Sequence, residues 1–465
     1  MIDILIIGGG IIGCATAHFL SKYDLNICVL EQEEDVSIGA SKANSGIVHS
    51  GFDCVPGTLK ASLNVQGASM YKELVKTLDI PYRNNGSMVL NFDDNNKLEE
   101  LYKQGIQNGV TGLEILDYNT VISLEPNINR NVKFALRSST AGIISSYEAV
   151  IAFAEHASIN GVRFYFDTEV INIKDGYIVE TTKGNFSAKI IINAAGVESA
   201  RLNNMINEKQ EHILPQKGQY YILDNTQKHL VNHTIFQLPT PLGKGILVAP
   251  TVHYNIMLGP TAESIENGSD TSTTKQGLDT ILEKVALSLD FVPIKERIST
   301  FAGVRAKHES KDFVIEETRQ GFINAIGIDS PGLSAAPAIG KKIAELAIAR
   351  LEPSLNKNYI NNRIGIKHFK GLSKKAQAEL INENPAYGNI VCRCETITEA
   401  EILDAIKRPL GSKSLDTIKR RTRAGMGRCQ AGFCMIRQGE ILAKELGLLE
   451  KNITKNGQGS EVGIL

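Results

Sequence analysis

Four of the seven cysteines in this 465-residue chain lie near its C-terminus, at a spacing that could hold a metal. They form a Cys392-x-Cys394 pair and a Cys429-x₄-Cys434 pair, with 34 residues between the pairs. Thiolates are soft ligands that suit iron–sulfur clusters or zinc. Four together in a reducing compartment indicate a metal centre rather than disulfides. Zinc is the principal alternative to a cluster, although zinc sites usually space both cysteine pairs two to four residues apart. The other cysteines are expected to pack as small apolar residues: Cys14, Cys28 and Cys54.

A glycine-rich turn near the N-terminus is the second chemically informative pattern. Residues 3–7 are apolar and mostly β-branched, which is typical of a buried parallel strand. Gly8, Gly10 and Gly13 follow as Gly-x-Gly-x-x-Gly, and a helix of small residues is predicted over 14–20. The first glycine permits a tight turn, the second lets a pyrophosphate approach the backbone, and the third lets helix and strand pack closely. The pattern predicts a dinucleotide site at the start of that helix.

An acidic residue supports this prediction. A second apolar segment, 26–30, ends in Glu31, which lies 18 residues after Gly13, where a dinucleotide-binding unit places its acceptor for ribose hydroxyls. The motif alone does not distinguish NAD from FAD. The segments that bear on this choice are a polar, glycine-punctuated loop at 41–51 and an apolar strand at 190–196 that ends in small residues.

Other segments must position these residues. Alternating apolar runs such as 87–92 and 245–250 predict strands in the middle of the chain. Near the cysteines, Thr398 and Glu401 predict a capping box for a helix over 399–407, and a second helix is predicted over 415–423. The sequence does not show which middle-region polar residues face a ligand: the candidates are Lys217, Tyr220, His233, His253 and Tyr254.

The region between the two halves is basic. Residues 353–428 contain fifteen Lys and Arg against seven Asp and Glu, and 419–423 is the densest part. Three interpretations stay open: a solvated helix face, compensation of the negative thiolates, or a docking patch for an acidic redox partner. Nucleic-acid binding is not expected, because no fold motif accompanies the charge.

Bulk composition limits the function classes. The length allows two or three domains, and 42% hydrophobic with 22% charged residues is ordinary for a globular protein. The net charge of −1 gives no argument for nucleic acid or an anionic membrane. No apolar run of membrane-spanning length and no signal peptide is expected. We therefore expect a cytoplasmic protein, with peripheral association at the inner face of the membrane through partners as an option.

Several motifs carry a family resemblance. Residues 1–350 resemble the D-amino-acid-oxidase-type flavoprotein superfamily, and segments 44–52, 301–307 and 330–337 are most similar to its glycerol-3-phosphate and L-2-hydroxyglutarate branches. Residues 385–440 resemble the bacterioferritin-associated-ferredoxin-like 2Fe–2S domain, with the longer cysteine spacing of its dehydrogenase-fused versions. The combination resembles the A-subunit type of anaerobic FAD-dependent glycerol-3-phosphate dehydrogenase.

The resemblance implies two cofactors, FAD and a 2Fe–2S cluster, and a fold. The expected fold class is α/β: a Rossmann-like FAD-binding domain with an inserted antiparallel-sheet substrate domain, plus a small helical C-terminal iron–sulfur domain. The implied bounds are 1–352 for the oxidoreductase, 353–384 for a linker and 385–465 for the 2Fe–2S domain. Within the oxidoreductase, the nucleotide-binding segments are about 1–80, 145–212 and 300–352, and the substrate-domain segments are about 81–144 and 213–299.

The resemblance also implies site residues. His49 would take the proton of a substrate hydroxyl, and Arg305 would bind the substrate anion through its planar fork. The alternatives are a packing histidine and a surface ion pair. Ser45, Lys307 and Ser334 are further substrate candidates, and Ser334 is also expected to cap the helix that follows. The implied cofactor contacts are Gly8, Gly10, Ile12, Gly13, Glu31, Ser41, Asn44, Ser45, Val170, Ala195, Gly196, Gly332, Leu333 and Ser334. The implied cluster ligands are Cys392, Cys394, Cys429 and Cys434.

The activity that the resemblance implies is oxidation of sn-glycerol 3-phosphate to dihydroxyacetone phosphate. Electrons would pass through FAD and the 2Fe–2S cluster to further redox subunits, a quinone or another acceptor. Three alternatives remain: an L-2-hydroxyglutarate or other L-2-hydroxyacid dehydrogenase, an opine, proline or amine dehydrogenase subunit, and an electron-transfer subunit of a larger complex.

Overall fold

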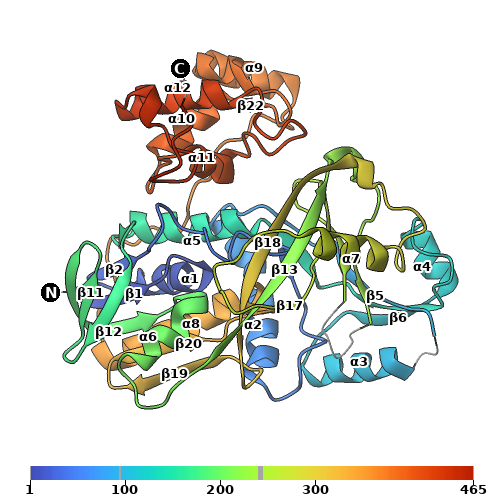
Figure 1. The fold of residues 1–465 in the computed structure, drawn as a ribbon, viewed down its shortest axis with the longest axis horizontal. Helices are drawn as coiled ribbons and strands as arrows, with labels where there is room; N and C mark the ends of the chain where they lie inside the picture. Colours follow the sequence, from blue (N-terminus) through green and yellow to red (C-terminus); the bar gives the residue numbers. More distant parts are fainter. Residues whose placement is uncertain (1, 94–95, 239–244, 464–465) are drawn as a thin grey trace.

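The computed structural model describes residues 2–93, 96–238 and 245–463. Figure 1 shows a large lower part that contains two sheets and a smaller helical part, coloured red, above it. The helical part is the C-terminal end of the chain and contains all four cysteines of the predicted metal site. No helix in the described ranges is long and apolar enough to span a bilayer.

The first sheet is built around strand β1 (Ile2–Ile7). It has eight strands, in the order β10-β11-β12-β1-β2-β9, with β20 and then β19 added beside β12. β1 pairs in parallel with both β2 and β12. Ile4 and Ile6 belong to one hydrophobic cluster and Leu5 and Ile7 to another. The strand is therefore buried on both faces, which explains its continuous apolar sequence.

Helices cover this sheet. Helix α1 (Ile11–Leu20) begins directly after the glycine turn and packs against α5 (Ser146–Ile159) and α8 (Gly332–Leu351). Helix α2 (Leu59–Thr77) packs on the other side of α8. The remaining strands of the sheet are β2 (Ile27–Leu30), β9 (Arg163–Tyr165), β10 (Val170–Lys174), β11 (Ile178–Thr181), β12 (Gly184–Asn193), β19 (Val314–Arg319) and β20 (Phe322–Ile326).

The second sheet is inserted between these segments. It has nine strands, in the order β17-β13-β16-β15-β14-β5-β7-β6, with β18 along the other edge of β13. All its pairs are antiparallel except β5 with β14, which is parallel. The strands predicted in 87–92 and 245–250 are found as β5 and β15. The bounds are β5 (Ser87–Asn91), β6 (Leu113–Asp117), β7 (Phe134–Ser138), β13 (Ile213–Leu223), β14 (Thr234–Gln237), β15 (Leu247–Pro250), β16 (Ile256–Gly259), β17 (Glu263–Ser264) and β18 (Arg297–His308).

Shorter elements complete the lower part. A three-stranded sheet lies in the order β3-β8-β4. Its strands and the remaining helices are β3 (Ile47–Val48), β4 (Tyr82–Arg83), β8 (Gly142–Ile144), α3 (Asn96–Gln107), α4 (Tyr118–Leu124), α6 (Ser199–Asn204) and α7 (Lys275–Val285).

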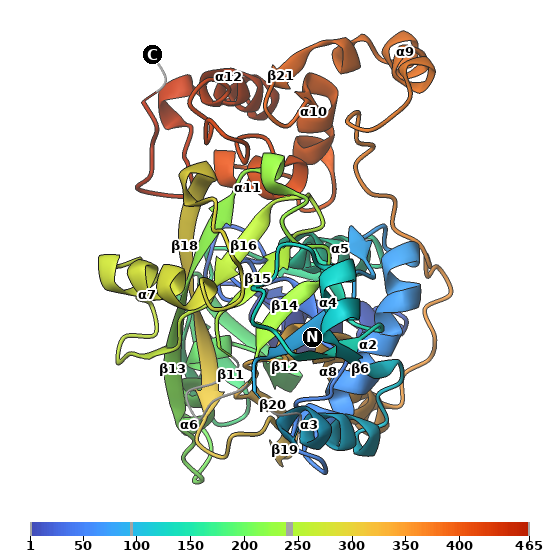
Figure 2. The same ribbon diagram turned by 90° about the vertical axis from the view of Figure 1, so that its right-hand side faces the viewer.

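The C-terminal part has its own small core. The capping box predicted at Thr398 and Glu401 is present at the start of α10 (Glu399–Lys407). The second predicted helix is α11 (Leu415–Thr422), which ends one residue early because Arg423 is left-handed, with φ of 70°. The other elements are α9 (Lys374–Glu383), β21 (Ile390–Cys392), β22 (Ile397–Thr398) and α12 (Met435–Leu446). In both views α11 is the helix of this part nearest the lower part (Figures 1 and 2).

The expected fold class is confirmed: an α/β nucleotide-binding part, an inserted, almost wholly antiparallel sheet and a small helical C-terminal part. The domain bounds 1–352, 353–384 and 385–465 stay a prediction. The segment expected to be a linker contains helix α9.

Candidate active site and metal centre

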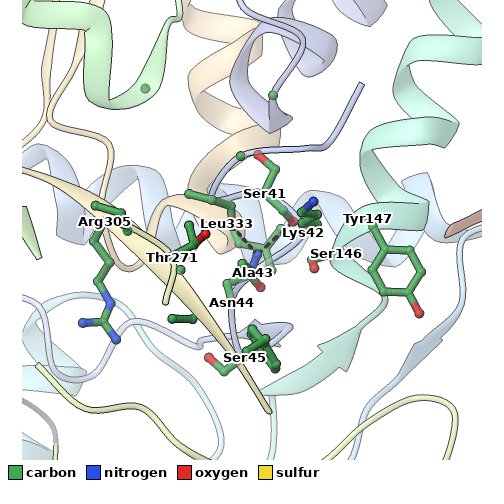
Figure 3. Close-up of a pocket in the computed structure, with 18 of the residues that line it drawn as sticks. Ser41, Lys42, Ala43, Asn44, Ser45, Ser146, Tyr147, Thr271, Arg305 and Leu333 are labelled. Atoms are coloured by element: carbon green, nitrogen blue, oxygen red, sulfur yellow. Dashed lines mark hydrogen bonds between the residues drawn. The ribbon is translucent and has the colours of Figure 1, made fainter. Parts of the chain in front are cut away.

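A large cavity lies between the two sheets. Its volume is about 1460 Å³, which exceeds the range of about 300–1,000 Å³ of ordinary small-molecule pockets. The glycine turn, the loop 38–47, strand β18 and the start of α8 all line it. In Figure 3 the loop residues Ser41–Ser45 lie between Arg305 on one side and Tyr147 on the other. The cavity is large enough for a dinucleotide together with a small substrate.

The three glycines of the turn have different surroundings. A Cβ on Gly8 would lie 2.5 Å from the Ala194 oxygen, and one on Gly13 would lie 1.9 Å from the Gly8 oxygen. Backbone atoms therefore leave no room for a side chain at either of these two positions. A Cβ on Gly10 would meet only the Ser41 hydroxyl, at 3.2 Å, and Gly10 lines the cavity. The turn therefore fits the backbone approach that a pyrophosphate needs.

Glu31 lines the cavity beside this turn. Its two oxygens accept hydrogen bonds from the backbone amides of Gly9, at 2.6 Å, and Glu33, at 3.0 Å. Burial raises the pKa of Glu31 to about 7, although these amide bonds favour the carboxylate. The Gln32 amide bonds this carboxylate as well, which leaves one of its four lone pairs, so the position fits an acceptor for a ribose hydroxyl.

The loop after Glu31 is held by its own side chains. The Ser41 hydroxyl accepts a hydrogen bond from the Ile11 amide, at 2.9 Å, at the start of α1. The Asn44 side-chain nitrogen donates to the Ser41 backbone oxygen, at 2.9 Å, and its side-chain oxygen accepts from the Gly46 amide, at 2.8 Å. Asn44 therefore braces the loop as well as lining the cavity.

The cavity brings together almost all of the predicted cofactor contacts. Gly13 does not line it and instead packs against Gly8. The other predicted contacts that line it are Ile12, Ser45, Val170, Ala195, Gly196, Gly332, Leu333 and Ser334.

His49 is buried and lines the same cavity. Its backbone amide donates to the Ser334 hydroxyl, at 2.8 Å, and that hydroxyl donates to the Ile47 oxygen, at 3.2 Å. The His49 ring is 5.5 Å from the ring of Phe236. The prediction that Ser334 caps a helix is wrong: α8 begins at Gly332, after Pro331, so Ser334 lies inside its first turn. It fastens the His49 segment to α8.

Arg305 lines the cavity from strand β18. Its Nη1 donates to the Gln216 Oε1, at 3.1 Å, from the facing strand β13, with longer contacts to the Thr261 oxygen. No carboxylate pairs with Arg305 within the described ranges, so it is not a surface ion pair. Lys307, two residues along the same strand, lines the cavity too. Two cations on one face of β18 suit an anionic ligand.

The structure separates the middle-region candidates. Tyr220 and His253 line the cavity; the Tyr220 ring stacks on Phe301 at 4.6 Å, and His253 bonds Glu148 at 2.9 Å. The other three do not line it: Lys217 pairs with Asp270, His233 pairs with Glu125, and Tyr254 is exposed beside Arg83.

The four C-terminal cysteines lie together. The sulfurs of Cys394 and Cys429 are 3.6 Å apart, and Gln438 donates to the Cys434 sulfur at 3.0 Å. Hydrogen bonds from Cys434 and from backbone amides lower the pKa of Cys392 to about 6, although burial opposes this. Four thiols with amide donors around them fit a 2Fe–2S cluster.

A glycine permits this close arrangement. A Cβ on Gly427 would lie 2.3 Å from the Cβ of Cys394. Cys394 is exposed and Cys429 is partly exposed, whereas Cys392 and Cys434 are buried. As expected, the remaining cysteines are buried and make no disulfide: Cys14, Cys28 and Cys54.

The basic run 419–423 is not a solvated helix face. Arg421 forms a two-pronged pair with Asp35, at 2.6 and 2.9 Å, and Arg420 adds a third bond at 3.0 Å. These side chains are at most 5% exposed. Burial would raise the pKa of Asp35, but the two arginines overcome it and hold the pKa below its usual range. The acidic partner of this basic run is Asp35, in the nucleotide-binding part of the same chain.

Sequence reasoning missed one wall of the cavity. Tyr147 of α5 contributes to it, and so do six residues of the C-terminal part: Asp416, Lys419, Arg420, Arg423, Met426 and Gln430. The basic run 419–423 is visible in the sequence, but its place in the cavity wall is not, because its residues reach the cavity only through contacts across several hundred residues of chain.

Comparisons with known proteins agree with this geometry. Residues 3–346 match the family described as FAD dependent oxidoreductase, and residues 390–444 match the BFD-like [2Fe-2S] binding domain. A glycerol 3-phosphate dehydrogenase of Caloramator mitchellensis is 45% identical and covers 99% of this chain and 98% of its own length. A glycerol 3-phosphate oxidase of Mycoplasma genitalium is 35% identical over 77% of this chain and 97% of its own length.

Further relatives match part of the chain. L-2-hydroxyglutarate dehydrogenase of Caenorhabditis elegans is 30% identical over 56% of this chain. Among solved structures, dithionite-reduced L-α-glycerophosphate oxidase of Mycoplasma pneumoniae with FAD bound aligns with a TM-score of 0.75 and 29% identity. It covers 79% of this chain and 99% of its own length. The chain belongs to the FAD dependent oxidoreductase family and carries a C-terminal BFD-like [2Fe-2S] binding domain.

Proposed function

We propose that the protein is a dehydrogenase that oxidises sn-glycerol 3-phosphate to dihydroxyacetone phosphate, with FAD and a 2Fe–2S cluster as its cofactors. The observation that carries this proposal is the similarity to a glycerol 3-phosphate dehydrogenase over the whole chain, which includes both cofactor domains. The cavity is consistent with it, since a histidine and two cations line the same space as the glycine turn.

Arg305 and Lys307 are proposed to bind the phosphate. Arg305 presents a planar fork that matches phosphate oxygens, and Lys307 adds a second charge on the same face of β18. Gln216 holds the guanidinium in place through its side-chain oxygen, at 3.1 Å. The guanidinium N–H groups that Gln216, the Thr261 backbone oxygen and the Tyr220 hydroxyl leave free are proposed to bind the anion.

His49 is proposed to accept the proton of the substrate's secondary hydroxyl. An imidazole suits this task because its ordinary pKa lies near working pH. Phe236 packs beside the ring, and Ser334 fixes the backbone that carries it. FAD, when bound, supplies the hydride acceptor.

The cluster is proposed to be the exit for the electrons. Met426 and Gln430 line the cavity on either side of the ligand Cys429, so the ligand turn lies next to the flavin space. A 2Fe–2S cluster supplies a one-electron relay. The proposed acceptors beyond it are additional redox subunits, a quinone or another carrier, with association at the inner face of the membrane through those partners.

An L-2-hydroxyacid such as L-2-hydroxyglutarate is the second candidate substrate. L-2-hydroxyglutarate dehydrogenases are among the relatives, and Arg305 can bind a carboxylate as readily as a phosphate. Amine, opine or proline oxidation, and a purely electron-transferring role in a larger complex, are weaker candidates, because a relative that is similar over the whole chain is a glycerol 3-phosphate dehydrogenase.

The test is flavin reduction without air. FAD-loaded protein is mixed with glycerol 3-phosphate, L-2-hydroxyglutarate, L-lactate, proline or octopine, and loss of flavin absorption is followed. Glycerol 3-phosphate is expected to bleach the flavin at the lowest concentration. Bleaching by L-2-hydroxyglutarate alone would transfer the assignment to the second candidate. Bleaching only by a partner protein would support an electron-transfer subunit.

A further inference from the structure

The C-terminal domain is part of the cavity, not an appendage. Six of its residues line the same space as the glycine turn, and they come from helix α11 and the turn that carries Cys429. Both ribbon views place α11 between the rest of the helical part and the two sheets (Figures 1 and 2). One wall of the flavin cavity therefore belongs to the cluster domain.

Buried charges hold this wall near the nucleotide end. Asp35 lies four residues after Glu31 and binds Arg421 and Arg420 of α11. Beside it, the Ser414 hydroxyl donates to Glu34, at 2.5 Å. A carboxylate left in such a place without its arginines would be strongly unfavourable, so the two parts are held together here.

Arg423 continues the contact along the cavity. It donates to the Tyr147 hydroxyl, at 3.2 Å, and to the Asn255 oxygen, at 3.1 Å, both of which come from residues that line the cavity. It also donates to Glu395, at 3.2 Å, directly after the ligand Cys394. The cavity wall and the ligand turns are thus joined through one guanidinium, whose side chain is 12% exposed.

Two ion pairs of Arg428, whose side chain is 61% exposed, form a third contact at the surface, which we call the rim. Arg428, next to Cys429, bonds Asp224 at 3.1 Å and Glu296 at 2.6 Å, both on the substrate-domain side. The contacts between the two parts therefore extend from Asp35, near the nucleotide end, to Glu296, at the start of β18. The oxidase relative from Mycoplasma genitalium matches over 97% of its own length but only 77% of this chain, a shortfall comparable in size to the cluster domain.

We propose that the cluster domain has a second function: it covers the flavin cavity and keeps dioxygen from the reduced cofactor. The ion pairs of the rim hold this cover closed. Uncovered, reduced FAD would give two electrons and two protons to dioxygen, which yields hydrogen peroxide and oxidised FAD. The proposal rests on FAD occupying this cavity, as the proposed function also requires, and does not depend on which substrate reduces it.

The experiment opens the rim without touching the cavity or the cysteines. Asp224→Lys combined with Glu296→Lys places two cations against Arg428, where the protein has two anions. Flavin is reduced without air by light, with EDTA as the electron donor, so no substrate is needed. The reduced protein is then mixed with oxygen-saturated buffer in a stopped-flow instrument. Hydrogen–deuterium exchange of α11 reports opening independently of any reaction, and FAD and iron contents show that both cofactors are retained.

The expected result is a roughly tenfold larger open population, which corresponds to about 1.4 kcal/mol. Exchange of α11 and the rate of peroxide formation should both rise by that factor. Adding Arg428→Glu to the double variant restores opposite charges and should return both quantities to the parent values. The matched control is Asp175→Lys, which makes like charges at the exposed pair with Arg319, far from the rim, and should change neither.

Two results would overturn the proposal. If α11 exchanges faster but reduced flavin meets dioxygen no faster, the domain is not a barrier. If exchange stays at the parent level in the double variant, the rim pairs do not hold the cavity shut. Neither result bears on glycerol 3-phosphate as substrate, because the flavin is reduced by light.

Discussion

Gly10 and Gly13 belong to one motif, but substituting them should affect the protein in different ways. Gly10→Val directs its side chain into the cavity past Ser41, so the protein should fold and lose most of its FAD. Gly13→Ala drives a Cβ against the Gly8 backbone oxygen and should lower stability by about 1–3 kcal/mol or more. FAD content and thermal unfolding of the two variants check this. A Gly10→Val protein with normal flavin content would contradict the placement of the cofactor at this turn.

Substitutions of the two proposed substrate-binding residues should have different kinetic effects. His49→Ala should lower turnover by about two to four orders of magnitude, the range of general acid–base groups, at near-normal FAD content. Arg305→Ala should mainly raise KM, since it removes an anion contact made in both ground and transition states. Arg297→Ala, on the same strand but exposed and outside the cavity, is the control. If His49→Ala protein reduces its flavin at the parent rate, the proton acceptor is another group.

At the scale of elements, a buried histidine pair joins α1 to α5. The Nδ1 atoms of His18 and His156 are 2.9 Å apart, and the other ring nitrogen of His156 is 3.2 Å from the Asn361 oxygen. Burial lowers the pKa of both histidines from 6.5. The unfolded chain therefore binds more protons than the folded protein below pH 6.5, so stability is present above that pH and is lost as the pH falls.

This pair makes a pH prediction. Between pH 7.5 and 5.5 the free energy of unfolding should fall more in the parent than in His18→Asn, by up to about 1.4 kcal/mol per pH unit. Urea unfolding at the two pH values measures it. His229→Asn, at an exposed histidine, should keep the parent's pH dependence. An equal slope in His18→Asn and parent would show that the pair does not titrate with unfolding.

The sequence predicted elements whose signals are local. The apolar run 3–7, the glycines after it and the capping box at Thr398 each depend on neighbours within a few residues, and each is present. The cap predicted at Ser334 is absent because α8 begins two residues earlier, at Gly332, and the Ser334 hydroxyl instead bonds the His49 segment, 285 residues away in sequence. The local sequence does not reveal the partner of 419–423, because Asp35 lies near the other end of the chain.

At the scale of the whole molecule, the ligand turn next to the cavity should control where electrons leave. Cys429→Ser should leave substrate-driven flavin reduction intact and suppress transfer to the physiological acceptor, while small dyes that reach the flavin are still reduced. Gln430 and Met426 line the cavity, so the substitution should be checked for normal FAD content. Transfer to the physiological acceptor at the parent rate would show that the cluster is not on the electron route.

The metal content decides between a relay and a structural site. About two irons and two labile sulfides per chain are expected in protein purified without air. Zinc in their place, with no iron after reconstitution and no paramagnetic signal on reduction, would defeat the cluster assignment. Zinc has no redox chemistry, so electrons would then have to leave from the flavin itself.

The pair between Asp35 and Arg421 also has a consequence for biosynthesis. The two residues are 386 positions apart. At translation rates of about 5–20 residues per second, Arg421 is made roughly 20–80 s after Asp35. The other walls of the cavity are complete once α8 ends at Leu351, so only its α11 wall is missing while the last 70 of these residues are made, for roughly 4–14 s. We expect FAD to enter the growing chain during this time, before the last helices emerge from the ribosome and close over it.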